Sequence, residues 1–477
     1  MRFGLQIHEA FWLSLLWAIC LCAAAAPAAT APAKVHVYPA PAGEELSQAY
    51  SVKVEGEPLP VYVCKVAPGD KARRWKAMDE VAHSADYFDK AAFVYFDVSG
   101  PVNVTVTCPD VIHSAKVLPT SYGIAPKFKD KALSLSLDGP RNLTLEINGD
   151  WVHSLHLFAS PVETDVPRAD DPNVVYFGPG IHEVHDGIKI ADGMTLYIAG
   201  GAILRGTGPG GGAVVSLLGN HITLRGRGIL DGTLCPTHSR NLLRVQGSDI
   251  RIEGVILRDS STWNVPIRRS DRVVVKNLKV LGNRANSDGI DVCNSRDVMI
   301  DGCFVRTLDD LLVVKSDKGQ GEVHHVLVKN CVLWNQLAHA LSIGAELREN
   351  VDDVSFVDCD IIHDTSREWS LRVFHSDAAT ISNVRFENIR IEESHNLISL
   401  WIGKAVWSKD VERGHIKSVE LKNISATGDP LRIELRGFDP DHRVEDVAFE
   451  NIVLNGKPLA PSDIQSNQFV NRINIKP

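Results

Sequence analysis

Acidic side chains gather in the second half of this chain. Asp288, the adjacent pair Asp309 and Asp310, and then His339 each come just before a short apolar stretch typical of a β-strand. Neighbouring carboxyl groups can supply a general acid and a general base, because crowded like charges raise the pKa of at least one of them. The pattern therefore predicts acid–base chemistry. Hydrolysis of a glycosidic bond is one such reaction, in which an acid protonates the leaving oxygen and a base activates water.

A repeated strand phrase must position these residues. It consists of alternating apolar residues followed by Asn, Asp or Gly, and its starts lie 23 to 35 residues apart. Little helical patterning separates the copies, so the repeat predicts a parallel β-helix over residues 166–477. The copies begin at Met194, Ile222, Ile250, Val273, Val298, Val326, Val354, Val384, Val419 and Val447.

Residues at the same phase of successive coils form a row with a spacing of about 4.8 Å. Asp309 and Asp310 would point to opposite faces of a regular strand, so we expect a backbone bend that brings both to one cleft. The simpler alternative is a solvated aspartate pair in a turn. The wall predicted from the phases holds Trp263, Asp288, Asp309, Asp310, His339 and Arg372.

The cysteines fit the same repeat. Cys303, Cys331 and Cys359 each follow the Asn, Asp or Gly of their coil at intervals of 28 residues, so they are predicted to stack inside the helix as small core side chains. No Cys or His cluster has the spacing of a zinc site. Cys64 and Cys108 are a candidate disulfide.

The N-terminal part of the chain lacks this repeat. Residues 34–165 carry short alternating runs separated by turn residues, which predict an antiparallel β-sandwich, so that the whole chain is all-β. The boundary is expected between Pro161 and Pro172. Residues 1–26 have the basic start, apolar stretch and small residues of a secretory signal peptide, which predicts a secreted or periplasmic protein.

Charge and hydropathy exclude some partners. The net charge of −9 argues against a nucleic-acid partner, which would require a basic surface. The apolar stretch near the N-terminus is short for a membrane span, and no later segment is apolar enough over a sufficient length. We expect the partner to be a polysaccharide or oligosaccharide.

The candidate residues resemble the motifs of glycoside hydrolase family 28, the polygalacturonase family. The resemblance covers about residues 172–455. It implies a right-handed β-helix and inverting hydrolysis with no metal or other cofactor. The segments that carry it are Asn286-Ser-Asp288-Gly-Ile-Asp291, Asp309-Asp310, His339-Ala-Leu-Ser-Ile-Gly344 and Leu371-Arg372-Val373, with Ser261-Thr-Trp263-Asn upstream.

The same resemblance implies roles for these residues. Asp309 would be the general acid, whereas Asp288 and Asp310 would hold the attacking water. His339 would tune the acid, and Arg372 would bind the sugar. The remaining predicted substrate contacts are Trp263, Asn286, Lys315 and Phe374.

Two departures from the family pattern concern the substrate. Phe374 stands where the family has a lysine, so a partner for a uronic carboxylate is replaced by a stacking face. Alanines, Ala338 and Ala340, flank the histidine in place of glycines. The N-terminal sandwich and the run from Asp309-Asp310 to Lys315 are similar to the related family 49 of dextranase and isopullulanase. These features favour a neutral or mixed glycan over polygalacturonate.

Several alternatives remain open from the sequence. A polysaccharide lyase on the same fold would need a basic proton abstractor and often calcium, and a non-catalytic glycan-binding β-helix would leave the polymer intact. Inversion predicts a separation of about 6.5–9.5 Å between the Asp309 carboxyl and the base. The glycan, exo or endo action and the oligomeric state are not predicted. Further candidates for sugar contacts, with core packing as the alternative for the tryptophans, are Trp334, Glu346, Trp369, Trp401 and Trp407.

Overall fold

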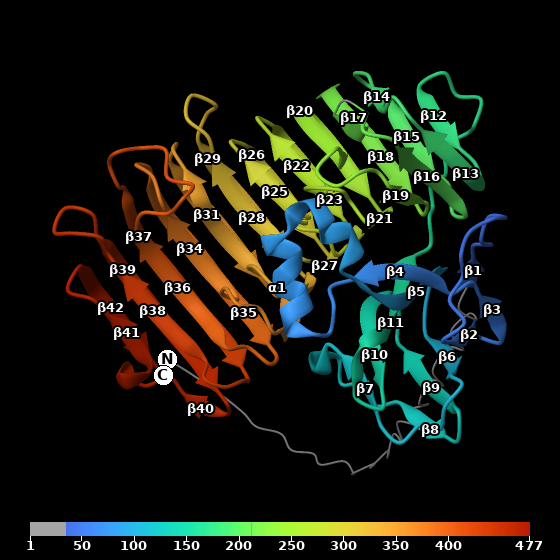
Figure 1. The fold of residues 1–477 in the computed structure, drawn as a ribbon, viewed down its shortest axis with the longest axis horizontal. Helices are drawn as coiled ribbons and strands as arrows, with labels where there is room; N and C mark the ends of the chain where they lie inside the picture. The colour runs from blue at the N-terminus through green and yellow to red at the C-terminus, as the bar shows by residue number, and fades with distance from the viewer. Residues whose placement is uncertain (1–34, 211) are drawn as a thin grey trace, which may run out of the picture. The chain divides into compact units, whose positions relative to one another are not determined.

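The repeated strand phrase forms one sheet of a right-handed parallel β-helix (Figure 1). The computed structural model describes residues 35–210 and 212–477, so the predicted signal peptide lies outside the described residues. The repeat starts pair in register from coil to coil: Val273 lies beside Val298, and Val298 beside Val326. The predicted β-helix is confirmed.

Three parallel sheets build the coils, which we call the repeat sheet, the middle sheet and the site sheet. The repeat sheet contains β12 (Val174–Phe177), β15 (Thr195–Ile198), β18 (Thr223–Gly226), β23 (Asp271–Lys276), β26 (Arg296–Asp301), β29 (Val323–Lys329), β32 (Val351–Val357) and β42 (Val470–Lys476). The middle sheet contains β13 (Gly180–Val184), β16 (Ala202–Thr207), β19 (Ile229–Leu234), β21 (Ile256–Arg258), β24 (Lys279–Leu281), β27 (Phe304–Thr307), β30 (Val332–Asn335) and β33 (Asp360–Asp364).

The site sheet contains β14 (Ile188–Ile190), β17 (Ala213–Asn220), β22 (Val265–Arg268), β25 (Ile290–Cys293), β28 (Leu312–Ser316), β31 (Leu341–Leu347), β34 (Leu371–His375), β36 (Asn396–Ile402), β38 (Arg432–Arg436) and β41 (Ile464–Ser466). Four long strands each bend through two sheets: β20 (Asn241–Glu253), β35 (Thr380–Ile391), β37 (His415–Ala426) and β39 (Val444–Leu454). Between β39 and β41 come β40 (Lys457–Pro458), which pairs with β39 antiparallel, and the 3-10 helix η3 (Pro461–Asp463).

The Asn, Asp or Gly that ends each repeat has a structural cause. At this position the backbone turns from the repeat sheet into the middle sheet with a positive φ, for example 53° at Asn277, 65° at Gly302 and 55° at Asn330. Only Gly, Asn and Asp adopt this left-handed conformation readily. The residue types that punctuate the sequence therefore mark the corner of the β-helix.

The cysteine row behaves as predicted. Cys303, Cys331 and Cys359 are fully buried and belong to the apolar core of the β-helix. The disulfide considered between Cys64 and Cys108 is wrong, because both residues are free thiols. They belong to different clusters: Cys108 lies between the two N-terminal sheets, whereas Cys64 packs toward the β-helix.

The N-terminal residues form two sheets with an apolar core between them. The first sheet contains β1 (Val35–Val37), β4 (Tyr62–Val66), β5 (Asp89–Val98), β7 (Ala115–Leu118), β10 (Arg141–Ile147) and β11 (Asp150–Pro161). The second contains β2 (Ser51–Val54), β3 (Glu57–Leu59), β6 (Val102–Thr107), β8 (Lys127–Lys129) and β9 (Ala132–Leu137). The helices of this region are α1 (Lys71–Asp79) and the 3-10 helices η1 (Val81–Asp86) and η2 (Thr120–Tyr122).

One pairing departs from the predicted antiparallel pattern. Strands β5 and β11 run parallel, with Leu155 beside Ala92. The chain between them passes through the second sheet, so no hairpin turn forces these two strands to be antiparallel. The other pairings of both sheets are antiparallel.

The first sheet packs against the middle sheet of the β-helix through an aromatic cluster. Phe93 and Phe158 meet Phe304 and Trp334 there, and the guanidinium of Arg306 lies 3.7 Å from the Trp334 ring centroid. Trp334 is fully buried in this interface. Among the tryptophans considered as sugar contacts it is therefore a core residue.

A buried histidine also joins these parts. His363 on β33 hydrogen-bonds through Nδ1 to Glu393 at 2.5 Å and through Nε2 to Glu146 on β10. Burial lowers the pKa of His363, but the two carboxylates outweigh burial and raise it above the ordinary value. The interaction therefore stabilises the fold below the unfolded-state pKa of histidine, and this stability is lost as the pH rises through the higher folded-state pKa.

We expect His363→Asn to destabilise the protein more in acid than in alkali. Removing one member of a buried charged cluster costs about 3–5 kcal/mol. Thermal unfolding of the variant and the wild type at about pH 5 and about pH 9 measures the difference. The control is His153→Asn, which removes an exposed histidine–aspartate pair and has a small effect. Equal losses of Tm at the two pH values for His363→Asn would contradict the assignment.

Across residues 35–210 and 212–477, no helix combines the length and the apolar character needed to span a membrane.

Candidate active site

Four of the predicted site residues occupy one row. Val265, Ile290, Leu312 and Leu341 pair in register across β22, β25, β28 and β31. The residue two positions before each of them lies in the turn that enters the strand. Those four residues are Trp263, Asp288, Asp310 and His339. The common phase predicted from the sequence is therefore confirmed for these residues.

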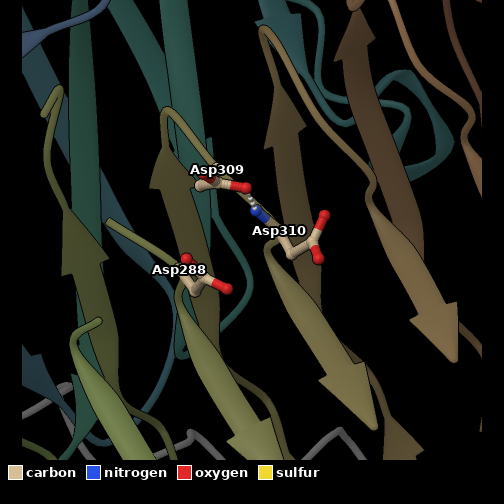
Figure 2. Close-up of side chains that lie close together, drawn as sticks. All are labelled: Asp288, Asp309 and Asp310. Atoms are coloured by element: carbon tan, nitrogen blue, oxygen red, sulfur yellow. Dashed lines mark hydrogen bonds between the residues drawn. The ribbon is translucent and has the colours of Figure 1, made fainter. Parts of the chain in front are cut away.

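Asp309 reaches the same place because the backbone bends. Residues 308–311 lie between β27 and β28 and are not part of either strand. Leu308 packs against Ala67 and Ala77 of the N-terminal region, whereas Leu311 enters the β-helix core, so apolar anchors hold both ends of the bend. The Asp310 amide donates to Asp309 Oδ1 at 2.9 Å, the dashed line of Figure 2.

The three carboxylates are close together. One oxygen of each of Asp288, Asp309 and Asp310 lies within 4.8 Å of the others, and Figure 2 shows them in the turns of adjacent coils. This separation is shorter than the range of about 6.5–9.5 Å expected for inversion, so that prediction is wrong. The range describes two carboxyls that flank the sugar from opposite sides, whereas here all three project from one wall. The spacing therefore does not decide the stereochemistry.

Lys315 neutralises part of this charge. Its Nζ lies 2.8 Å from Asp288 Oδ2 and 3.2 Å from Asp291 Oδ1, and 4.1 Å from the ring centroid of Trp263. Asp291 is fully buried. The sequence prediction placed Lys315 against the substrate, and the structure places it in the cleft but bound to two carboxylates.

His339 links the carboxylates to Arg372. Its Nδ1 lies 2.6 Å from Asp310 Oδ1, and its Nε2 lies 2.9 Å from Arg372 Nη1. The same Nη1 donates to Glu368 at 2.9 Å. Arg372 comes from within β34, where it pairs with Ser342, so its phase differs from that of the row. Its long side chain nevertheless brings the guanidinium to the imidazole.

The environment separates the pKa values of Asp309 and Asp310. Burial raises the pKa of Asp309, and the charges of Asp288 and Asp310 add to it, giving a value of about 8. Burial acts in the same direction on Asp310, but His339 outweighs it and lowers the Asp310 pKa below the ordinary range. Burial also raises the pKa of Asp288, which Lys315 opposes. At neutral pH Asp309 can therefore donate a proton while Asp310 can accept one.

All nine residues predicted to act in catalysis or substrate binding line one cleft of about 490 Å³. Glu346, Trp401 and Trp407 line it too, but Trp369 is not among the lining residues. Sequence reasoning missed Glu368, Lys404 and Met78. Met78 belongs to α1, so the N-terminal region contributes to the wall of the cleft. The nine predicted residues are Trp263, Asn286, Asp288, Asp309, Asp310, Lys315, His339, Arg372 and Phe374.

We expect Lys315→Met to move the pH optimum upward. Lys315 lowers the pKa values of Asp288, Asp309 and Asp310, so its loss raises all three. The profile of kcat/KM against pH should then shift toward alkali on both limbs. The control is Lys422→Met, which breaks an ion pair with Glu450 outside the cleft. A Lys315→Met profile that is lower but not shifted would show that Lys315 acts only on stability.

The three aspartates are also the candidate metal ligands. Within the described part of the chain they form the one group of at least three His, Cys, Asp or Glu residues whose ligand atoms have suitable spacing. Carboxylate oxygens suit hard cations such as Ca²⁺, which prefer six to eight oxygen ligands in total. The ammonium of Lys315 already lies within hydrogen-bond distance of Asp288. The prediction that the chemistry needs no metal stays a prediction.

Comparisons with known proteins agree with this geometry. A family model described as "Glycosyl hydrolases family 28" matches residues 188–470. A probable polygalacturonase of Arabidopsis thaliana is 26% identical over 228 residues, which are 45% of this chain and 48% of the relative. An exopolygalacturonase of Zea mays is 24% identical over 190 residues, or 37% of this chain and 44% of the relative. The chain thus matches about half the length of these curated relatives.

A solved structure shares the fold over most of the chain. Dex49A from Penicillium minioluteum superposes with a TM-score of 0.55 over 92% of this chain and 96% of that chain, at 13% sequence identity. Likeness at this identity shows the fold alone. It extends over the N-terminal sheets as well as the β-helix, in agreement with the predicted similarity to family 49.

Proposed function

Because the chain belongs to glycoside hydrolase family 28, we propose that it hydrolyses O-glycosidic bonds of a pectin-like or related polysaccharide or oligosaccharide, with inversion and without a metal. The single observation that carries the proposal is the cluster of Asp288, Asp309 and Asp310 in one cleft, with pKa values displaced in opposite directions at Asp309 and Asp310. Such a pair can divide the acid and base roles between its members.

In the proposed reaction Asp309 is the general acid. Its raised pKa keeps the carboxyl protonated at neutral pH, and it gives this proton to the glycosidic oxygen as the bond to the anomeric carbon breaks. Asp310 and Asp288 hold a water molecule, which attacks the anomeric carbon while a proton passes to Asp310. The balanced outcome is one bond cleaved, one water consumed and two sugar hydroxyls formed.

His339 and Arg372 support this division. The imidazole beside Asp310 keeps the pKa of that carboxyl low, so Asp310 remains an acceptor. On the other edge of the imidazole, Arg372 Nη1 donates to Nε2. The guanidinium lines the cleft, where it can donate to a sugar hydroxyl. Lys315 holds Asp288 in place and moderates the charge of the cluster.

Location and partners follow from the same proposal. A polysaccharide outside the cell requires an exported enzyme, which fits the predicted signal peptide at residues 1–26. The proposed partner is a polymer or oligomer of sugars, and the N-terminal sandwich at residues 34–165 precedes a catalytic β-helix at residues 166–477.

The test distinguishes a hydrolase from a lyase and from a binding protein. The purified enzyme is incubated with pectic polysaccharides and defined oligosaccharides, with and without a chelator. We expect new reducing ends, no ultraviolet-absorbing unsaturated product, and the same rate in the chelator. An unsaturated product would indicate a lyase, intact polymer a binding protein, and loss of activity restored by Ca²⁺ a metal-dependent enzyme.

A further inference from the structure

An aromatic corner closes the cleft beyond Arg372. We give this name to Phe374, Trp401 and Trp407. Phe374 and Trp401 pair in register on β34 and β36, and their rings stack with centroids 4.6 Å apart and an interplanar angle of 8°. Trp407 meets Phe374 edge-on at 6.4 Å and is 55% exposed. The corner therefore offers aromatic surface to a ligand where a lysine would offer charge.

Hydrogen bonds from two buried side chains hold the loop that carries Trp407. Arg413 is buried and donates to the carbonyl of Gly403, at 3.3 Å, and to those of Asp410 and Val411. Asp377, also buried, accepts from the amides of Lys409 and Asp410 at 2.7 and 2.8 Å. These bonds fix the loop on both sides of Trp407, so its exposed ring has a defined position in the cleft.

The cations at the floor of the cleft are already paired. Lys315 binds Asp288 and Asp291, and Arg372 binds Glu368 at 2.9 Å. The Arg372 guanidinium also lies 4.3 Å from the Phe374 ring centroid. A sugar carboxylate bound at this floor would lose its hydration and meet only cations that already have carboxylate partners.

Two buried polar atoms near the corner instead suit hydroxyl groups. Ser342 Oγ and Arg372 Nε have no hydrogen-bond partner within residues 35–210 and 212–477. Both residues line the cleft, and Ser342 lies beside Arg372 in the sheet register. Sugar hydroxyls both donate and accept, so they can satisfy a hydroxyl and an N–H donor at once.

We propose that the sugar unit bound beyond His339, at the aromatic corner, is uncharged: a neutral pyranose whose apolar face stacks on Trp401 and Trp407 and whose hydroxyls bind Ser342 and Arg372. This inference rests on the proposed hydrolase function and names its substrate class. Arg367 and Lys404 at the rim of the cleft are the remaining cations, and they represent the competing possibility of a uronic acid.

The test compares substrates that differ only in charge. Tetragalacturonate, its methyl ester and its carboxyl-reduced form share linkage and ring stereochemistry. Their binding to Asp309→Asn is measured by titration calorimetry, and their cleavage by the wild type as kcat/KM. We expect both uncharged forms to be favoured over the free acid by about tenfold or more. Equal or preferred binding of the free acid overturns the inference.

Two tryptophan variants test where the neutral sugar binds. Trp407→Ala should weaken binding of the neutral tetramer to the Asp309→Asn protein by about three- to tenfold, the loss typical of one aromatic contact. The control is Trp75→Ala, which removes a tryptophan on α1 that is 38% exposed and does not line the cleft. An unchanged affinity in Trp407→Ala, or an equal loss in Trp75→Ala, overturns the stacking site.

The two proposals fail in different ways. If the wild type cleaves none of these or other glycans while the neutral tetramer still binds better than the acid, the hydrolase function fails and the preference for an uncharged unit stands. If the wild type cleaves only the free acid, the hydrolase function stands and the preference for an uncharged unit is overturned.

Discussion

Asp309→Asn is expected to lower kcat on a natural glycosidic bond by about 10²–10⁴-fold, the contribution of a positioned general acid. The asparagine keeps the size of the side chain and can still accept from the Asp310 amide, but it has no proton to give the leaving oxygen. The same change should remove the fall in kcat/KM above about pH 8, because that limb reports the deprotonation of Asp309.

The leaving group provides the sharpest control for this variant. A glycosyl fluoride of the sugar that the wild type releases needs little protonation, so Asp309→Asn should cleave it within about tenfold of the wild-type rate. Asp317→Asn serves as the matched control, because Asp317 is an exposed aspartate that does not line the cleft. An equal loss of rate on the fluoride and on the natural substrate would contradict the acid role of Asp309.

Asp310→Asn is the second large effect that we expect, with a loss of kcat of about 10²–10⁴-fold. Asp310 is the carboxylate with the lowered pKa, and it takes the proton of the attacking water in the proposed reaction. Its replacement also removes the charge that raises the pKa of His339. Asparagine cannot accept a proton, so the step in which water attacks is impaired.

The rate on the same glycosyl fluoride distinguishes Asp310→Asn from Asp309→Asn. An activated leaving group does not replace the base, so Asp310→Asn should remain slow on the glycosyl fluoride as well as on the natural substrate. Circular dichroism should stay close to that of the wild type, since the substitution keeps the side-chain volume, whereas Tm should fall because Asp310 loses its buried ion pair with His339. Rescue of Asp310→Asn by the fluoride would indicate that Asp310 is the general acid and Asp309 the base.

The fold was predictable because the regular coils of a β-helix require a periodic pattern in the sequence. Coils repeat a strand phrase, and the left-handed corner after it restricts one position to Gly, Asn or Asp, as at Asn277 and Gly302. The row of Asp288, Asp310 and His339 could be predicted for the same reason, since equal phase in consecutive coils means a shared wall. The parallel pairing of β5 with β11 left no such periodic signal.

The rest of the site consists of side chains whose positions do not follow from the coil repeat. Glu368 comes from a turn before β34, and Met78 comes from α1 in another part of the chain. Arg372 lies out of phase and reaches His339 only through its length. The separation of the carboxyls depends on side-chain direction at the bend of residues 308–311, which is why the expected distance was wrong.

The anomeric configuration of the first product tests the central claim most directly. Proton NMR of the reaction, recorded before the released sugar equilibrates, identifies the anomer that the enzyme forms. A water held by Asp288 and Asp310 and a proton from Asp309 predict a product of inverted configuration. A product of retained configuration would mean that one of these aspartates forms a covalent intermediate and would contradict the account.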